Sequence, residues 1–273
     1  MRNYILIFLL ILSHLSCKTE KEKDEQNLKT ETEFKNKSLN GVWIMTSYFD
    51  SIVENRTISK YRMKTPTWFA LIIEISNDSI HNYGSIINDS QKINFKSDTL
   101  AILSGIGVAG DWILQKKDQT LILNHLPNEY LVDTTSYTFE KRKNLEFLIE
   151  KDSENKIDLW KSTTDYFNEK IIFGKYINKK DTIIFGKNRK VRNFKDFENY
   201  RIVNYFGTSH PFNPYDVIFL TNENEFKPYN WKFDNNKLIL TNFIPKEEIY
   251  KGKKYVTDDN ILGNEIIELI KIE

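Results

Sequence analysis

The chain has 273 residues, 14% of them aromatic, and its 39 lysines and arginines nearly balance 38 aspartates and glutamates. This length allows one large or two small domains, and the balanced charge gives no electrostatic reason to expect nucleic acid as a partner. Because isoleucine and aromatic residues are frequent while alanine is scarce, the composition favours strands over helices. We therefore expect an all-β protein that does not bind nucleic acid.

The N-terminus carries a targeting segment. Arg2 precedes an apolar run over residues 4–12, which has the length of a signal-peptide core and is short for a membrane-spanning helix. "SHLSC" follows at residues 13–17, and Cys17 is the only cysteine of the chain, so no internal disulfide can form. The thiol is either incidental or a site of modification. We expect residues 1–16 to be a signal peptide.

The segment that ends at Cys17 resembles the lipobox of bacterial lipoproteins, in which a diacylglycerol is attached to the cysteine before cleavage makes it the new N-terminus. Ser16 is the small residue that this family has before the cysteine, whereas His14 and Leu15 depart from its usual leucine followed by a small residue. These departures leave an uncleaved anchor or an ordinary signal peptide as alternatives. The resemblance implies a membrane anchor of acyl chains, such as palmitate, on Cys17.

Residues 17–37 are predicted to be a flexible tether. After Cys17 the segment holds six lysines, six acidic residues and almost nothing apolar, so it cannot bury enough surface to fold. The residue after the cysteine is Lys18 rather than an aspartate, and acidic clusters come next. These features resemble those of lipoproteins sorted to the outer membrane, on either its periplasmic or its outer face.

Residues 38–150 are predicted to form a first β-barrel unit. Short apolar runs follow one another without helical patterns between them, which favours an antiparallel meander over βαβ units. The predicted strands lie at residues 41–48, 68–75, 79–86, 91–95, 99–103, 111–114, 120–125, 136–141 and 145–149. "GIGVAG" at residues 105–110 matches a nucleotide-binding fingerprint, but the next strand begins too soon for the helix that such a site needs, so we interpret it as a strand connection.

Residues 157–273 are predicted to form a second unit that repeats the first. Its predicted strands lie at residues 171–176, 181–185, 200–205, 216–220, 230–233, 237–241, 253–257 and 265–272. Three pairs of landmark residues recur at a spacing of 117 to 119 residues: Trp43 and Trp160, Trp112 and Trp231, and Pro127 and Pro245. About eight strands close a small barrel whose interior is either filled by side chains or holds a ligand. A tandem duplication of one barrel explains both observations.

The later of two repeated hairpins is "WKFDNNKLIL", residues 231–240. Asparagine tolerates the positive φ of a tight turn, so the strands are expected to pair antiparallel about the Asn-Asn dipeptide. This pairing predicts that Trp231 lies opposite Leu240 and Phe233 opposite Leu238, all on one apolar face.

The earlier hairpin is "WILQKKDQTLIL", residues 112–123. Here the turn is predicted to be two residues longer, over residues 116–119. It is then expected to place Trp112 opposite Leu123 and Leu114 opposite Leu121, again on one face.

"SLNGVW" at residues 38–43, followed by the meander and the tryptophan hairpin, resembles the lipocalin-like domains of bacterial lipoproteins. In that family an early Gly-x-Trp, here ending at Trp43, closes the base of the barrel. The second copy has Trp160 without the preceding glycine. The resemblance implies that Arg142 is the late arginine that stacks on the early tryptophan by a cation–π contact.

Six apolar residues are the candidate ligand-binding residues, because aromatic groups on an inward face either line a cavity or fill it. They are Trp43, Trp112, Leu114, Trp160, Trp231 and Phe233.

No catalytic or metal-binding motif is found in the sequence. His81, His125 and His210 have no zinc spacing, and Ser209 and Asp216 near His210 lie in a proline-rich loop without a nucleophile elbow. We expect no cofactor, no metal and no enzymatic activity.

The densest basic run is "GKNRKVRNFK", residues 186–195. It is either the solvated tip of a hairpin or a surface for anionic glycans or lipid headgroups. The candidate residues for such a surface are Lys187, Arg189, Lys190 and Arg192.

Two functions follow from these expectations. The first is a lipid-anchored envelope protein that binds a small hydrophobic or glycan ligand without catalysis. The second is a structural or assembly lipoprotein whose barrels are closed, which holds no ligand, and whose partner is another envelope protein.

Lipidation predicts that labelling with an alkyne analogue of palmitate is lost in the Cys17→Ala variant, because that variant lacks the only thiol of the chain. The label is read by in-gel fluorescence after click coupling, with Ser16→Ala as a control that keeps both the thiol and a small residue before it. Persistent labelling of Cys17→Ala would contradict the assignment.

Overall fold

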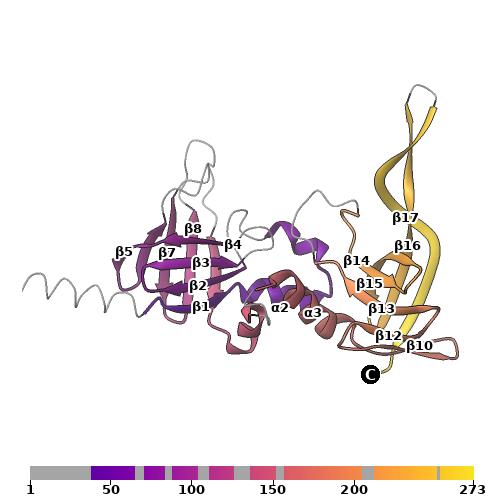
Figure 1. Cartoon of the computed structure of the whole chain (residues 1–273), viewed down its shortest axis with the longest axis horizontal. Coiled ribbons are helices and arrows are strands. Elements are labelled where there is room, and N and C mark those ends of the chain that lie inside the picture. Colours follow the sequence, from indigo (N-terminus) through magenta and orange to yellow (C-terminus); the bar gives the residue numbers. More distant parts are fainter. Residues whose placement is uncertain are drawn as a thin grey trace, which may run out of the picture. The chain divides into compact units, whose positions relative to one another are not determined.

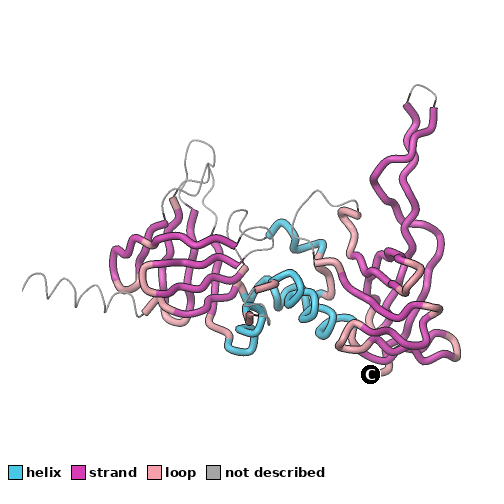
Figure 2. The backbone as a smooth tube through the Cα atoms, viewed as in Figure 1, coloured by secondary structure: helices cyan, strands magenta, loops and turns pink. Residues whose placement is uncertain are grey.

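The computed structural model describes residues 38–64, 71–83, 88–103, 111–125, 136–151, 157–204, 212–250 and 253–273. Strands predominate, as Figure 2 shows, and they form two antiparallel sheets, one of nine strands and one closed barrel. The predicted mostly β class with two barrel-like sheets is therefore confirmed. Cys17 and residues 105–110, 209 and 210 lie outside the described residues.

Contacts divide the chain into two compact units. The first comprises residues up to Trp43, 74–81 and 90–138, and the second comprises residues 44–73, 82–89 and 139–273. Every helix of the described part belongs to the second unit. The repeat boundaries at residues 150 and 157 stay a prediction.

The first sheet is a nearly closed meander in the order β4-β3-β2-β1-β9-β8-β7-β6-β5 (Figure 1). Its two edges, β4 and β5, follow each other in the sequence. The strands are β1 (Gly41–Ile44), β2 (Ile72–Ser76), β3 (Ser79–Tyr83), β4 (Asn88–Lys92), β5 (Asn94–Ser97), β6 (Leu100–Leu103), β7 (Trp112–Lys117), β8 (Thr120–His125) and β9 (Ser136–Glu140).

The β7–β8 hairpin has a different register from the predicted one. Lys117 pairs with Thr120 across a two-residue turn, in which Asp118 has a φ of 54°. Trp112 therefore lies opposite His125 and Leu114 opposite Leu123, and the predicted pairs with Leu123 and Leu121 are wrong. Because the error is two residues and side chains alternate with period two, the face is unchanged, and both Trp112 and Leu114 are buried.

The second sheet is a closed barrel in which β10 pairs with both β11 and β17. In its β15–β16 hairpin Trp231 lies opposite Leu240 and Phe233 opposite Leu238, as predicted. The strands are β10 (Gly174–Asn178), β11 (Asp181–Phe185), β12 (Lys190–Phe194), β13 (Phe197–Ile202), β14 (Val217–Thr221), β15 (Phe226–Asp234), β16 (Lys237–Tyr250) and β17 (Lys253–Lys271).

Aromatic side chains fill the interior of this barrel. Phe185 contacts Tyr176 and Tyr200 edge-to-face, with ring centroids 5.4 and 4.9 Å apart, and all three rings are buried together with Trp231. The hydroxyl of Tyr176 donates to the carbonyl of Ile172 at 2.6 Å, and that of Tyr200 donates to the carbonyl of Gly186 at 2.8 Å. The two tyrosine hydroxyls are thus satisfied. The buried indole N–H of Trp231, by contrast, has no hydrogen-bond partner within the described residues.

The structure also contains helices, which the sequence pattern did not predict. They lie at residues 46–55 and 159–172. They form α2 (Thr46–Asn55), α3 (Leu159–Phe167) and the π-helical η4 (Asn168–Ile172), and shorter 3₁₀ segments are η1 (Ser59–Lys64) and η3 (Lys143–Ile149). The buried residues of α2 are Thr46, Tyr48, Phe49 and Ile52, which is the spacing of one helical face. The predicted strand over residues 41–48 is therefore correct only for β1, which ends at Ile44, and the predicted strand over residues 145–149 is wrong because this segment is 3₁₀-helical.

In the described residues an α-helix stands before each run of strands. α2 is followed, after η1, by β2–β9, and α3 is followed, after η4, by β10–β17. Phe49 of α2 and Phe167 of α3 stack on each other, with ring centroids 5.7 Å apart. The tandem duplication stays a prediction.

A buried carboxylate fastens η1 to the second barrel. Asp216 is only 9% exposed, and its carboxylate accepts from the Thr57 hydroxyl at 2.6 Å and from the backbone N–H groups of Ile58 and Ser59 at 2.8 and 2.6 Å. The guanidinium of Arg62 donates to the carbonyl of Tyr215 at 2.9 Å. Burial lowers the pKa of Arg62, and the charge of Asp216 opposes that shift.

The Asp216→Ala variant is expected to lose about 3 kcal/mol of unfolding free energy, because three donors and a buried guanidinium lose the charge that they face. Urea unfolding followed by circular dichroism measures this loss. The exposed Asp196 in the β12–β13 turn provides a matched control, whose Asp196→Ala variant should stay within about 0.5 kcal/mol of the parent. Equal effects of the two substitutions would contradict the anchoring role.

Candidate functional site

The structure does not gather the predicted ligand-binding residues at one place. Trp43, Trp112 and Leu114 are buried in the first sheet, and Trp231 is buried in the second barrel. Phe233 is half-buried, and the guanidinium of Arg56 lies 4.6 Å from its ring centroid. Trp160 is half-buried and lies on α3. The four buried residues are therefore parts of the protein core.

The predicted basic surface is partly neutralised by acidic residues of α3 and η4. Lys187 pairs with Glu169 at 2.8 Å, and Arg189 pairs with Asp165. Lys190 and Arg192 are exposed on β12. The guanidinium of Arg142 donates two hydrogen bonds to the carboxylate of Asp50 at 2.6 and 2.7 Å. Its stacking on Trp43 stays a prediction.

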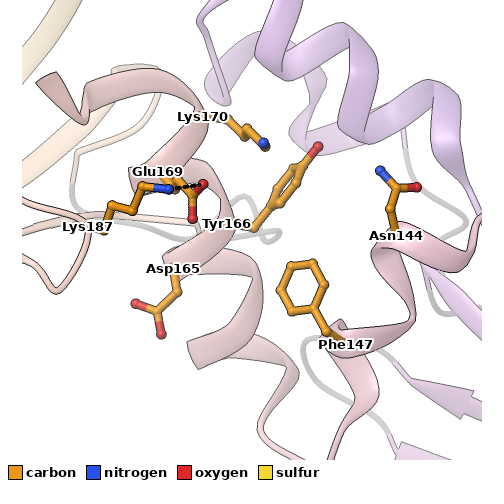
Figure 3. A pocket seen from close by; sticks show the side chains of 7 residues that line it. All are labelled: Asn144, Phe147, Asp165, Tyr166, Glu169, Lys170 and Lys187. Atoms are coloured by element: carbon orange, nitrogen blue, oxygen red, sulfur yellow. Dashed lines mark hydrogen bonds and ion pairs between the residues drawn. The ribbon is translucent and has the colours of Figure 1, made fainter.

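A cavity of about 290 Å³ lies beside α3 in the second unit. Its lining comes from η3, α3, η4 and the turn that precedes β12, as the close-up in Figure 3 shows. The lining residues are Asn144, Phe147, Asp165, Tyr166, Glu169, Lys170 and Lys187.

The helix that carries most of the lining is fixed to the barrel by buried polar groups. The side-chain oxygen of Asn168 accepts from the N–H of Ile202 on β13 at 3.0 Å. The amide of Asn204 donates to the hydroxyl of Thr163 at 2.6 Å. Because these side chains are fully buried, their bonds are costly to break. The cavity therefore has a rigid wall.

Lining residues of this helix are spaced so that they share one face. Asp165 and Glu169 are four residues apart, as are Tyr166 and Lys170, which places each pair one turn apart. Phe167 is buried next to this face, and its ring contacts that of Tyr166 with centroids 5.5 Å apart. The π-helical turn begins at Asn168, inside this stretch, and such turns occur often at functional sites.

Two aromatic rings form the apolar part of the cavity. Phe147 and Tyr166 have ring centroids 6.2 Å apart, with planes inclined at 45°, and Figure 3 shows the rings between Asn144 and the Glu169–Lys187 pair. Phe147 remains 39% exposed. Tyr166 also packs edge-to-face against Phe49 at 5.8 Å. The apolar face of a ligand can thus stack on the ring of Tyr166, which the contact with Phe49 holds in place.

Polar groups around the rings have defined states. Burial raises the pKa of Tyr166, so its hydroxyl stays protonated at neutral pH and can donate a hydrogen bond. The hydrogen bond from Lys187 lowers the pKa of Glu169, which therefore remains a carboxylate and an acceptor. The carboxylates of Glu169 and Asp165 are paired with Lys187 and Arg189. The cavity suits a small neutral molecule that has one apolar face and several hydroxyl or amide groups.

Sequence reasoning missed this site because the site depends on helices that were predicted as strand or left unassigned. A signal for α3 was present, since Leu159, Thr163 and Phe167 recur every four residues after Asp158. Asp158 is the N-cap of α3, and its carboxylate accepts from the N–H of Lys161 at 2.9 Å.

The described part of the chain also bears on metal binding and membrane insertion. Within it, no group of three or more histidine, cysteine, aspartate or glutamate side chains is placed to hold a metal ion. None of its helices combines the length and the hydropathy needed to cross a membrane.

Comparison with protein-family models gives no match for this chain, and comparisons with curated proteins and with solved structures give none either.

Proposed function

We propose that this protein is a lipid-anchored protein of the cell envelope that binds a small glycan, without catalysis, in the cavity beside α3. The observation that carries the proposal is the half-exposed ring of Phe147 next to Tyr166, surrounded by donors and acceptors of balanced charge. A sugar ring has a face of C–H groups that stacks on an aromatic ring and an edge of hydroxyls that needs such partners. Ligand pockets combine these two elements in the same way.

The size and lining of the cavity favour a mono- or disaccharide over a hydrophobic ligand. At about 290 Å³ the cavity lies at the lower end of the range for small-molecule sites. Five of its seven lining residues are polar or charged, whereas a lipid-like ligand needs a mostly apolar lining. The second barrel, the other candidate place for such a ligand, has an interior occupied by its own aromatic side chains.

Binding without catalysis agrees with the way the two carboxylates are held. Both Asp165 and Glu169 accept from basic partners on the β11–β12 connection. A general acid needs a carboxyl group that keeps its proton near neutral pH, and the lowered pKa of Glu169 is the opposite of that. These groups serve better as fixed acceptors for sugar hydroxyls.

The envelope location and the anchor rest on the N-terminal sequence. Residues 1–16 as a signal peptide, acyl chains on Cys17 and a charged tether to residue 37 would hold the folded part near an outer-membrane surface. The two barrel units are compatible with the proposed kinship to lipocalin-like lipoprotein domains.

Isothermal titration calorimetry with glucose, galactose, N-acetylglucosamine, cellobiose, lactose and chitobiose tests the glycan proposal. At least one of these sugars should bind, and Phe147→Ala should weaken that binding at least about tenfold, because the stacking face is lost. Phe226→Ala is the matched control, since Phe226 is an exposed phenylalanine on β15 that does not line the cavity. Binding that is equal in both variants, or absent for all six sugars, would contradict the proposal.

A second candidate is an assembly lipoprotein that binds another protein chain and holds no ligand. The observation that favours it is the set of exposed apolar side chains along β16 and β17, which includes Ile244, Ile249, Tyr255 and Val256. Exposed apolar patches of this kind often mark surfaces that bind another protein.

A further inference from the structure

The last two strands extend beyond the barrel as a two-stranded ribbon, drawn in yellow in Figure 1. β15 pairs with β16 only as far as Asn242, and β10 pairs with β17 only at Ile270 and Lys271. In the described residues, the stretches 243–250 and 253–262 therefore pair with each other alone. Both outer edges of the ribbon present backbone N–H and C=O groups to the surroundings.

The root of the ribbon is fixed to the barrel. The side-chain oxygen of Asn242 accepts from the N–H of Glu265 at 3.0 Å, and a Cβ at Gly263 would collide with the amide of Asn242. Glu265 in turn pairs with Lys195 at 2.6 Å and with Lys227 at 3.3 Å. The ribbon is thus an arm with a defined direction.

The arm exposes more apolar surface than an isolated ribbon can stabilise. Ile249 is 73% exposed, Val256 69% and Tyr255 50%. Two strands alone are marginally stable in water, and stability rises when further strands join the sheet. Exposed edges of this kind pair readily with another strand.

The open edge of β17 is complementary in charge to itself. "KKYVTDD" at residues 253–259 has two lysines before its centre, Val256, and two aspartates after it. If two copies pair antiparallel about a twofold axis at Val256, position 253 meets position 259 of the second copy and position 254 meets position 258. The four cross-strand pairs at these positions each join a lysine to an aspartate, which stabilises a sheet, whereas parallel pairing in register would oppose like charges.

The other edge of the arm is less suited to pairing. Pro245 lies within β16 and has no N–H to donate. On β17, by contrast, residues 257–259 lie opposite Lys246 alone, between the pairs Pro245–Asn260 and Glu247–Val256. Residues 257–259, which include the two aspartates, therefore form a bulge and have no regular pairing with β16. Bulges of this kind redirect side chains.

Two charged side chains of the segment 253–259, those of Lys254 and Asp259, are held only weakly within one chain. Lys254 lies 3.0 Å from Glu247, and Asp259 lies 3.7 Å from Lys246, with side-chain exposures of 73% for Lys254 and 67% for Asp259. Ion pairs this exposed contribute little to stability, so exchanging these partners for those of a second copy costs little.

We propose that the protein forms a twofold-symmetric dimer in which the β17 edges of two copies pair antiparallel, centred on Val256. The product is a continuous four-stranded sheet, β16-β17 of one copy followed by β17-β16 of the other. This pairing is independent of the glycan site, because none of the cavity residues belongs to β16 or β17.

Disulfide trapping in intact membranes tests the register directly. In the Val256→Cys variant the two introduced thiols face each other across the axis, with Cα atoms about 4.5–5.5 Å apart, which is suitable for a disulfide. Oxidation of the full chain should yield a dimer on a non-reducing gel. Ile249→Cys is the control, since Ile249 is equally exposed but lies on β16, away from the axis.

Charge reversal then tests the complementarity. Replacing both lysines at 253 and 254 by aspartate in the Val256→Cys background should lower the dimer yield at least about tenfold, because each pair becomes a like-charge contact. Replacing both aspartates at 258 and 259 by lysine should do the same. Coexpression of these two variants, distinguished by epitope tags, should restore the dimer, because every mixed pair is again opposite in charge.

Three results would overturn the proposal. The first is a Val256→Cys protein that stays monomeric or forms no more dimer than Ile249→Cys. The second is a low dimer yield that coexpression of the two charge-reversed variants does not restore. The third is a cross-linked product of another mass, which would place a different protein at this edge.

Discussion

Closure of the second barrel by the pairing of β10 with β17 is the constraint on which the second unit depends. Closure leaves an interior of fixed size, and the rings of Tyr176, Phe185 and Tyr200 pack into it. The hydroxyls of the two tyrosines are satisfied by backbone carbonyls. These rings stabilise the barrel from inside. The recognition site that we propose for this unit lies outside the wall.

Two features are built on that wall, and both derive from segments that continue past the barrel. Before the first strand, α3 and η4 are held against β13 by Asn168 and Thr163, and they carry the aromatic and charged lining of the cavity. After the last paired positions, β16 and β17 continue as the ribbon. A dimer formed through the ribbon would carry two cavities, and so would bind a repetitive glycan more tightly than one copy does.

The strand pattern could be predicted because alternation is a local property. Trp231 and Phe233 alternate with polar residues around an Asn-Asn turn, and the predicted pairs with Leu240 and Leu238 are confirmed. The pairs of Trp112 and Leu114 were wrong because the sequence does not show where "KKDQ" turns. The helices were missed because Thr, Tyr and Phe favour strands locally, while burial of Phe49 against Phe167 selects the helix. The cavity depends on those helices, so no motif indicated it.

The most direct test of an external site beside a filled barrel is a map of backbone amide shifts during sugar titration. Cellobiose, lactose and chitobiose are added in turn to the deuterated, ¹⁵N-labelled protein. The predicted result is that shifts concentrate at Asn144, Phe147, Tyr166 and Lys170, while Tyr200 and Trp231 inside the barrel stay unchanged. Shifts that concentrate at Tyr200 and Trp231 instead would show that the interior admits ligand and would contradict the account.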